Sequence, residues 1–333
     1  MAEKTPWGQL AELIGAGDSK LMPAIFEALT DEAEARVLLA AAPPATAAEL
    51  AERSGLDVAR VEAMIEPLFF RGLLFKSRKP KGTRYYRVRN VLQFHDATAV
   101  TLDPPPGVID LWKQYMDTEW TDYVVKLDTV LPGAVLRVIP VNVSIEASNQ
   151  ILAFEDVSQL VDTARRLAVT RCSCRVIDGA CGQPLEVCLQ IDRAADYAIE
   201  RGTGRELSKQ ETLQILEDCE YDGLVHVAQN QRGVGHVICN CCSDCCLNWT
   251  SLRHGAGKFA APSRFRAFVQ AEECSGCGMC IDRCFFEALT MEGQDHRALV
   301  EGESCMGCGL CQVSCPTEAI LMQEARPETF VPA

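Results

Sequence analysis

The sequence predicts an α+β protein of several domains, in which a cysteine-free N-terminal part precedes two cysteine-rich parts. A chain of 333 residues has room for two or three domains at roughly 100–200 residues each. No cysteine precedes Cys172, ten lie in the middle of the chain, and eight lie near its C-terminal end. A proline-rich segment at 103–107 and a glycine-rich segment at 255–262 mark breaks between these parts. We therefore expect domains at residues 1–103, 104–262 and 263–333.

Composition and charge narrow the class of protein. Hydrophobic residues make up 48% of the chain, which excludes general disorder. The net charge of −14 argues against a protein whose main task is to coat nucleic acid or an anionic membrane. No segment approaches the roughly 20 apolar residues of a membrane span, and the N-terminal residues lack a secretory signal pattern. We expect a cytoplasmic protein without a membrane span, whose 18 cysteines bind metal because thiols stay reduced there.

The N-terminal domain has the pattern of a helix-turn-helix. A first helix at 47–54 and a second at 57–71 are separated by Gly55, and Gly72 ends the second helix. A preceding helix at 31–41 completes the core.

A basic β-hairpin is expected next, at residues 76–91, with no acidic side chain in it. Its basic residues are Lys76, Arg78, Lys79, Lys81, Arg84, Arg87 and Arg89. Together with the helices before it, this hairpin resembles the wing of winged-helix domains, over roughly residues 20–95. The resemblance implies a winged-helix-like α/β-wing domain.

The second helix of this domain bears on whether it binds DNA or protein. Its early positions carry Asp57, Glu62 and Glu66 against Arg60, whereas a helix that reads the major groove usually presents Arg, Asn or Gln. The basic hairpin is compatible with phosphate contacts, but an acidic helix face is repelled by the groove. We expect protein docking or homodimerisation, with DNA binding as the alternative.

The middle domain has the pattern of an α/β layer. Ser208 and Glu211 form a capping box that opens a helix running to about Cys219. An amphipathic helix at 155–169 would deliver the first two cysteines at its C-terminal end. We expect strands at 136–143, 223–227 and 234–239, the last of which would place residues 239–246 in a loop at a strand end.

The cysteines of the middle domain indicate at least one further metal centre. Cys239, Cys242 and Cys245 form a C-x2-C-x2-C run that can wrap three corners of a cluster. This run lacks a fourth cysteine at a suitable spacing. A distant segment could supply that ligand, from Cys174, Cys181 or Cys188.

Other arrangements of these thiols are also open. A separate cluster could be bound by Cys172, Cys174, Cys181 and Cys188. A vicinal pair at 241–242 or 245–246 could be a redox-active dithiol. Zinc, or buried thiols without metal, are the remaining alternatives, and we favour an additional iron–sulfur centre.

Histidine and arginine side chains near these cysteines have two interpretations each. His226 and His236 could be ligands or proton donors, or packed strand residues. Arg171 and Arg175 could screen cluster charge or hold an anionic substrate, or be solvated.

The C-terminal domain contains a duplicated cysteine motif. Residues 274–284 and 305–315 both have the spacing C-x2-C-x2-C-x3-C, at an offset of 31 residues. A thiolate at every third position can wrap three irons of a cubane, and the glycines let the backbone approach the sulfides. The fourth cysteine points towards the partner cluster. One cluster is therefore assigned to Cys274, Cys277, Cys280 and Cys315, and the other to Cys305, Cys308, Cys311 and Cys284.

This segment resembles the bacterial two-cluster [4Fe-4S] ferredoxin domain over about residues 263–325. The resemblance implies two neighbouring one-electron carriers that form a relay. Phe285 stands where the first motif would carry proline, a change that concerns the turn and not the ligands. Structural zinc would leave half of each repeat unexplained. With 5 arginines, no lysine and 11 acidic residues, the domain suits a basic docking patch on a redox partner, and a plain solvated acidic surface is the alternative.

Three functions are compatible with this organisation. We favour an iron–sulfur electron-transfer protein or reductase component, which relays single electrons through the two [4Fe-4S] clusters to or from a cysteine-ligated centre in the middle domain. The alternatives are a redox-responsive winged-helix regulator and a structural subunit of a larger redox complex. No G-x-G-x-x-G or G-x4-G-K-[ST] motif supports a nucleotide or flavin cofactor. We expect an oxygen-sensitive protein of anaerobic metabolism, in which any oxidoreductase chemistry belongs to a metal centre or a partner subunit.

Overall fold

The structure is a computed structural model in which residues 4–141, 157–233, 235–293 and 296–332 are described. The chain forms two compact units. Unit 1 consists of Met1–Tyr123 with the short segments Cys172–Gly179 and Arg201–Thr203. Unit 2 consists of Val124–Arg171, Ala180–Glu200 and Gly204–Ala333. Helices and strands are mixed, as the sequence predicts.

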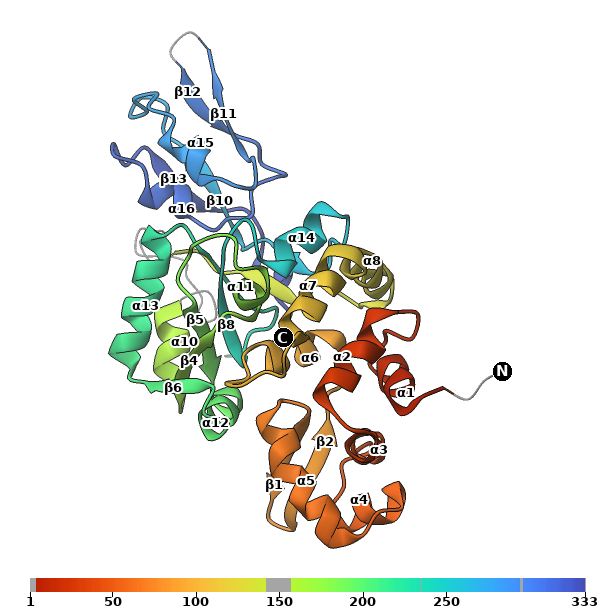
Figure 1. The fold of residues 1–333 in the computed structure, drawn as a ribbon. Coiled ribbons are helices and arrows are strands. Elements are labelled where there is room, and N and C mark those ends of the chain that lie inside the picture. The colour runs from red at the N-terminus through yellow and green to blue at the C-terminus, as the bar shows by residue number, and fades with distance from the viewer. Residues whose placement is uncertain (1–3, 142–156, 234, 294–295, 333) are drawn as a thin grey trace. The chain divides into compact units, whose positions relative to one another are not determined.

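Unit 1 is built mainly of helices and contains a β-hairpin (Figure 1). Its first elements are α1 (Pro6–Leu13), α2 (Leu21–Leu29), α3 (Glu32–Ala40), α4 (Ala47–Ser54), α5 (Val58–Phe70), β1 (Leu74–Lys79) and β2 (Gly82–Arg87). They are followed by α6 (Val91–Ala99), α7 (Val108–Thr118) and, from a later part of the chain, α11 (Ser173–Asp178). Helix α8 (Trp120–Val130) begins in unit 1 and ends in unit 2.

The elements of the predicted helix-turn-helix are confirmed. Thr46 forms a capping box with Glu49 at the start of α4, and Gly55 ends this helix at a φ of 70°. Asp57 caps α5 through its side chain. Strands β1 and β2 pair antiparallel. The hairpin begins slightly before the predicted segment, and Val91 already belongs to α6. The assignment of these elements to a winged-helix domain stays a prediction.

A buried aromatic cluster joins three helices of unit 1. The rings of Phe26 on α2 and Phe94 on α6 stack with their centroids 4.1 Å apart. Trp112 on α7 meets Phe94 edge-on, with the ring centroids 5.1 Å apart. The indole Nε1–H of Trp112 donates a hydrogen bond to the hydroxyl of Thr98 at 3.0 Å, so this buried donor is satisfied.

Unit 2 contains a seven-stranded sheet with the strand order β6–β4–β5–β8–β7–β3–β9. Its strands are β3 (Leu136–Val138), β4 (Leu167–Arg171), β5 (Glu186–Ile191), β6 (Gly204–Leu207), β7 (Val225–Gln229), β8 (Val237–Cys241) and β9 (Ala260–Ala261). Neighbouring strands are antiparallel except β3 and β9, which run parallel. The helices of this part are α10 (Val157–Thr163), α12 (Arg193–Glu200), α13 (Lys209–Tyr221) and α14 (Leu247–Arg253).

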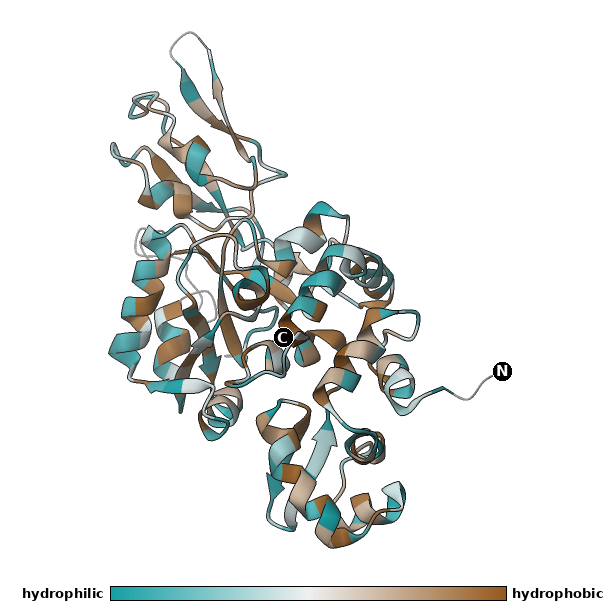
Figure 2. Cartoon of the chain, in the orientation of Figure 1, coloured by the Kyte–Doolittle hydropathy of each residue, from teal (hydrophilic) through white to brown (hydrophobic). Residues whose placement is uncertain are grey.

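The two faces of this sheet pack against different parts of unit 2. On one face Val169, Leu189 and Ile238 are buried together with residues of α10 and α13. Figure 2 shows hydrophilic and hydrophobic residues alternating along α13, as expected for a helix with one buried side. On the other face Val225 and Val227 belong to a second buried cluster, which includes α14 and residues from the C-terminal part of the chain.

The C-terminal part of unit 2 repeats one small motif twice. Its elements are β10 (Phe265–Val269), α15 (Met279–Arg283), β11 (Leu289–Glu292), β12 (Arg297–Val300), α16 (Leu310–Val313), β13 (Ile320–Glu324) and the 3-10 helix η2 (Glu328–Phe330). Strand β10 pairs with β13, and β11 pairs with β12, both antiparallel. The backbone repeats as well as the sequence: Gly278 and Gly309 precede the two short helices at φ values of 75° and 82°.

The predicted helix at 155–169 is wrong in its second half. Helix α10 ends at Thr163, and residues 167–171 form β4 between β5 and β6. Strand β4 is a central strand, because it hydrogen-bonds with a strand on each side and four of its five residues are buried. Residues 155–156 lie outside the described part of the chain. Cys172 and Cys174 therefore follow a strand and not a helix.

The other predicted elements of the middle region need smaller changes. The capping box of Ser208 and Glu211 is confirmed at the start of α13. The strands predicted at 223–227 and 234–239 lie two to three residues further along the chain, as β7 and β8. Cys239 and Cys241 thus belong to a strand, and not to the predicted loop. Strand β3 ends at Val138, and residues 142–143 of the predicted strand lie outside the described part.

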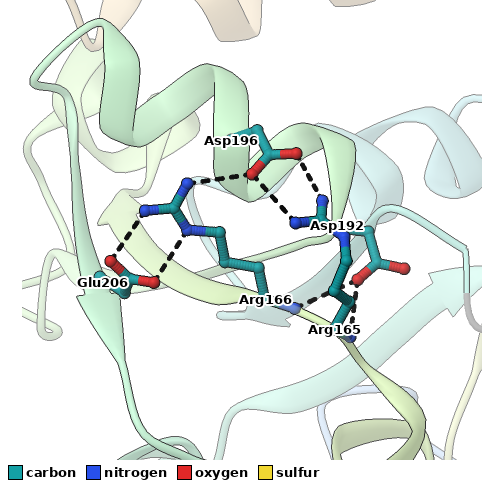
Figure 3. A network of polar contacts seen from close by, with 5 residues as sticks. All are labelled: Arg165, Arg166, Asp192, Asp196 and Glu206. Atoms are coloured by element: carbon teal, nitrogen blue, oxygen red, sulfur yellow. Dashed lines mark hydrogen bonds and ion pairs between the residues drawn. The ribbon is translucent and has the colours of Figure 1, made fainter.

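A network of charged side chains joins the edge of the sheet to α12 (Figure 3). Arg166 contacts Glu206 on β6 through two hydrogen bonds of 2.8 Å and Asp196 on α12 at 3.1 Å. Arg165 also pairs with Asp196, and the backbone N–H groups of both arginines donate to Asp192 at 2.8 and 3.3 Å. Hydrogen bonds from Arg166 lower the pKa of Glu206. Hydrogen bonds from both arginines outweigh burial and lower the pKa of Asp196.

Candidate iron–sulfur and thiol sites

A first cavity in the C-terminal part is lined by Cys274, Cys277, Cys280 and Cys315. Three of these cysteines come from the first repeat, and the fourth closes the second repeat. The cavity lies next to Met291 and Ile320, which provide apolar lining. Cys277 is exposed, so this cavity reaches the protein surface. A hydrogen bond from the backbone N–H of Met279 lowers the pKa of the Cys277 thiol.

A second cavity is lined by the other four cysteines of the two repeats, Cys284, Cys305, Cys308 and Cys311. Burial raises the pKa of Cys308 to about 12, and the thiols of Cys284 and Cys305 add to the rise. Burial also raises the pKa of Cys311 well above its usual range. Metal bound in this cavity would stabilise the thiolate form of these four cysteines.

Both groups of four cysteines combine three members of one repeat with the last member of the other. This is the grouping assigned from the sequence, and the binding of a cluster by each group stays a prediction. Eight soft thiolate donors in two sets of four fit two iron–sulfur clusters. The backbone N–H groups of Met279 and Leu310 hydrogen-bond the thiols of Cys277 and Cys308 at equivalent positions of the two repeats.

Aromatic side chains connect the second cavity to the sheet of unit 2. Phe285 and Phe286 line this cavity, and Trp249 on α14 packs on both rings, with centroid distances of 5.8 and 5.0 Å. The backbone N–H of Val141 also donates to the carbonyl of Cys308 at 2.9 Å. Phe285, which stands in the position expected for proline, thus provides a packing surface for the neighbouring sheet.

A first thiol group in the middle region is formed by Cys181, Cys242 and Cys245, and we call it the Cys181 group. Its three Sγ atoms all lie within 4.8 Å of one another. Cys242 and Cys245 are buried and Cys181 is half-buried. Cys181 is one of the three residues predicted to supply the fourth ligand to Cys239, Cys242 and Cys245. Within the described residues, Cys239 does not belong to this set of three.

A second thiol group is formed by Cys239, Cys241 and Cys246, and we call it the Cys241 group. Hydrogen bonds with the thiols of Cys239 and Cys246, together with burial, raise the pKa of Cys241 well above its usual value. Cys241 and Cys246 belong to the buried cluster that also contains Trp249, and the half-buried Cys239 and Cys308 pack against it. The Cys241 group therefore lies on the sheet face that packs against the second cavity.

The remaining predicted ligands lie elsewhere. Cys172 and Cys174 belong to unit 1, where a hydrogen bond between their thiols and burial raise the pKa of Cys172. The Sγ atom of Cys188 on β5 accepts a hydrogen bond from Gln190 at 3.2 Å. Of the two arginines beside the first cysteines, Arg171 is exposed and Arg175 is buried.

A buried polar network lies on the opposite face of β7 and β8 from the Cys241 group. His226 on β7 is fully buried, with its Nδ1 atom 2.6 Å from the Asn240 side-chain oxygen and its Nε2 atom 3.2 Å from Glu220. The Asn240 amide donates to the carbonyl of Val187 at 2.7 Å, which fixes its oxygen towards His226. His226 is thus a packed and hydrogen-bonded strand residue. His236 donates its backbone N–H to the side chain of Gln229.

Sequence reasoning missed the Cys241 group and the partners of His226. Cys239 and Cys241 are two residues apart in β8, so their side chains lie on the same face of the strand. Correct placement of β8 would have paired these two thiols. Glu220 and Asn240 carry no local signal, because they meet His226 only through the pairing of β7 with β8 and the end of α13.

The basic hairpin of unit 1 is partly neutralised by its own neighbours. Lys76 pairs with Glu66 of α5 at 2.7 Å, and Arg84 pairs with Glu49 of α4 through two contacts of 2.8 and 2.9 Å. Arg87 is buried and donates to the backbone carbonyl next to it. Fewer cations therefore face solvent than the seven basic residues of the sequence suggest.

Comparison with known proteins identifies the C-terminal part. Residues 267–322 match the family described as the 4Fe-4S dicluster domain. Searches of curated proteins and of solved structures gave no match. The C-terminal part is thus a ferredoxin-like dicluster domain, and this match supports iron–sulfur clusters there. Within the described residues, no helix is both long enough and apolar enough to cross a membrane.

Proposed function

We propose that this protein is an electron-transfer protein, or the electron-transfer component of a reductase. It relays single electrons through two [4Fe-4S] clusters in the dicluster domain, to or from the cysteine-rich sheet of unit 2. The first cluster is bound by Cys274, Cys277, Cys280 and Cys315, and the second by Cys284, Cys305, Cys308 and Cys311. The observation that carries this proposal is the pair of cavities, each lined by one of these two sets.

The surroundings of the two cavities support a direction for the relay. Cys277 in the first cavity is exposed, so the first cluster exchanges electrons with a partner protein. The second cavity is lined by Phe285 and Phe286, which pack on Trp249, and Cys308 packs against the buried cluster of the Cys241 group. The second cluster therefore exchanges electrons with the middle region, where two thiols of the Cys241 group act as a dithiol that is oxidised to a disulfide and reduced again by two single electrons.

The net negative charge of the dicluster domain supports a basic surface on the external partner. Opposite charges on two proteins speed their association and orient them. Unit 1 provides a docking or dimerisation module in this account. Its α5 presents exposed acidic residues, and two cations of the hairpin are already paired with Glu49 and Glu66. This arrangement favours a protein partner over DNA, and it weighs against a redox-responsive regulator.

Anaerobic reductive titration tests this function. The protein should take up about two electrons per chain, one for each cluster, and release them reversibly to a one-electron acceptor. A binding assay with duplex DNA should be run on the oxidised and the reduced protein. Failure of reversible reduction would overturn the relay. Sequence-selective DNA binding that changes on reduction would support the regulator instead.

A further inference from the structure

The Cys181 group joins two irregular segments that are far apart in the sequence. Cys181 lies in the segment 179–185, between α11 and β5, which has no helix or strand. Cys242 and Cys245 lie in the turn between β8 and α14. The spacing of these two residues, C-x2-C, is typical of thiolate-bound metal sites.

The sulfur spacing in this group indicates how many metal atoms it can hold. Four thiolates arranged as a tetrahedron around one zinc ion at about 2.3 Å lie about 3.8 Å apart. In a cubane each thiolate binds a different iron, so the width of the cluster separates the sulfurs further. The three Sγ atoms of the Cys181 group all lie within 4.8 Å of one another, a spacing that fits one ion shared by all three thiolates.

The dicluster domain provides a comparison within the same chain. Its cysteines line two cavities, and each cavity brings four of them together. Within the described residues, however, the set Cys181, Cys242 and Cys245 is the one in which three ligand atoms approach to within 4.8 Å. In neither set of four dicluster cysteines, all of which the structure describes, do three sulfurs therefore all lie within 4.8 Å of one another.

We propose that Cys181, Cys242 and Cys245 together bind one zinc ion, and not a third iron–sulfur cluster. Zinc prefers tetrahedral thiolate coordination and has no redox chemistry. The ion ties the segment 179–185 to the end of β8, next to the Cys241 group. Its fourth ligand is a solvent molecule or a group that lies outside this set of three. The proposal is independent of the relay, because zinc carries no electrons.

Metal analysis and zinc-edge X-ray absorption on the anaerobically purified chain test this proposal. We expect about one zinc per chain beside about eight irons, and a sulfur shell at about 2.3 Å around the zinc. This measurement on the unaltered chain does not depend on the folding of any variant. Zinc below about one-fifth of the protein concentration, or zinc without sulfur neighbours, would overturn the proposal.

Substitution to serine locates the ion. Cys242→Ser and Cys245→Ser should each remove zinc and leave the iron content unchanged. Cys246→Ser is the matched control, because Cys246 is equally buried in the same loop but belongs to the Cys241 group, and it should retain zinc. A loss of about four irons in Cys242→Ser, from a parent with about twelve, would show a third cubane and refute the zinc site. If the relay proposal is wrong, the result is a different one: the unaltered chain would lack iron in the dicluster domain, whatever its zinc content.

Discussion

Trp249 holds the dicluster domain against the sheet of unit 2, and its removal should destabilise both. Its side chain is 2% exposed and meets the rings of Phe285 and Phe286. Truncation of a buried tryptophan to alanine costs about 3–5 kcal/mol. For a unit of this size each kcal/mol lowers the thermal midpoint by about 2–4 °C. Trp249→Ala should therefore lower the midpoint of unit 2 by roughly 6–20 °C.

Circular dichroism under argon, with the clusters in place, measures this change. Tyr221→Ala is the control, because Tyr221 is also an aromatic residue of unit 2 but is 66% exposed, and it should change the free energy of unfolding by no more than about 0.5 kcal/mol. Trp249→Phe should fall between the two, since a smaller ring can still contact Phe286. A midpoint for Trp249→Ala equal to that of the control would refute the account of this junction.

Three further predictions concern charge, cluster binding and DNA. The pKa values of Asp196 and Glu206 are lowered in the folded state, so their contribution to stability is present above the ordinary carboxyl pKa of about 4 and is lost as the pH falls through the lowered values. Arg166→Met should therefore lower the thermal midpoint at pH 7, and this difference from the parent should vanish at about pH 2; a constant difference would contradict the ion-pair explanation. Cys277→Ala and Cys308→Ala should each reduce the iron content; because the relay is serial, Cys277→Ala should slow reduction of the second cluster by an external one-electron donor, whereas Cys308→Ala should leave the first cluster reducible at the parent rate, as followed by stopped-flow absorbance, and equal slowing of first-electron uptake in the two variants would contradict the proposed direction. Fluorescence anisotropy should give a DNA dissociation constant no tighter than the non-specific range of about 10⁻⁴–10⁻⁶ M, and nanomolar binding to one sequence would support the regulator.

Patterns that depend on a few neighbouring residues could be predicted from the sequence. The capping box at Ser208 placed the start of α13, and Gly55 placed the end of α4. Each of these signals is a hydrogen bond or a backbone conformation within four residues, so no distant contact is needed to read it. The 31-residue repeat likewise placed the dicluster domain, which the family match confirms.

Features that depend on pairing between distant segments could not be predicted in this way. Residues 167–169 looked helical because the apolar spacing of the preceding segment continued into them. They form a strand because β5 and β6 hydrogen-bond them on both sides. The grouping of the middle cysteines was missed for the same reason. A short displacement of β8 moved Cys239 from the expected metal loop onto a strand face with Cys241.

The most direct test of the relay is a count of iron and acid-labile sulfide per chain, combined with electron paramagnetic resonance of the dithionite-reduced protein. The account predicts about eight irons and about eight sulfides, matching two cubanes, with the signals of two reduced clusters that interact magnetically because they lie close together. About four irons, or zinc in place of iron in the dicluster domain, would contradict it.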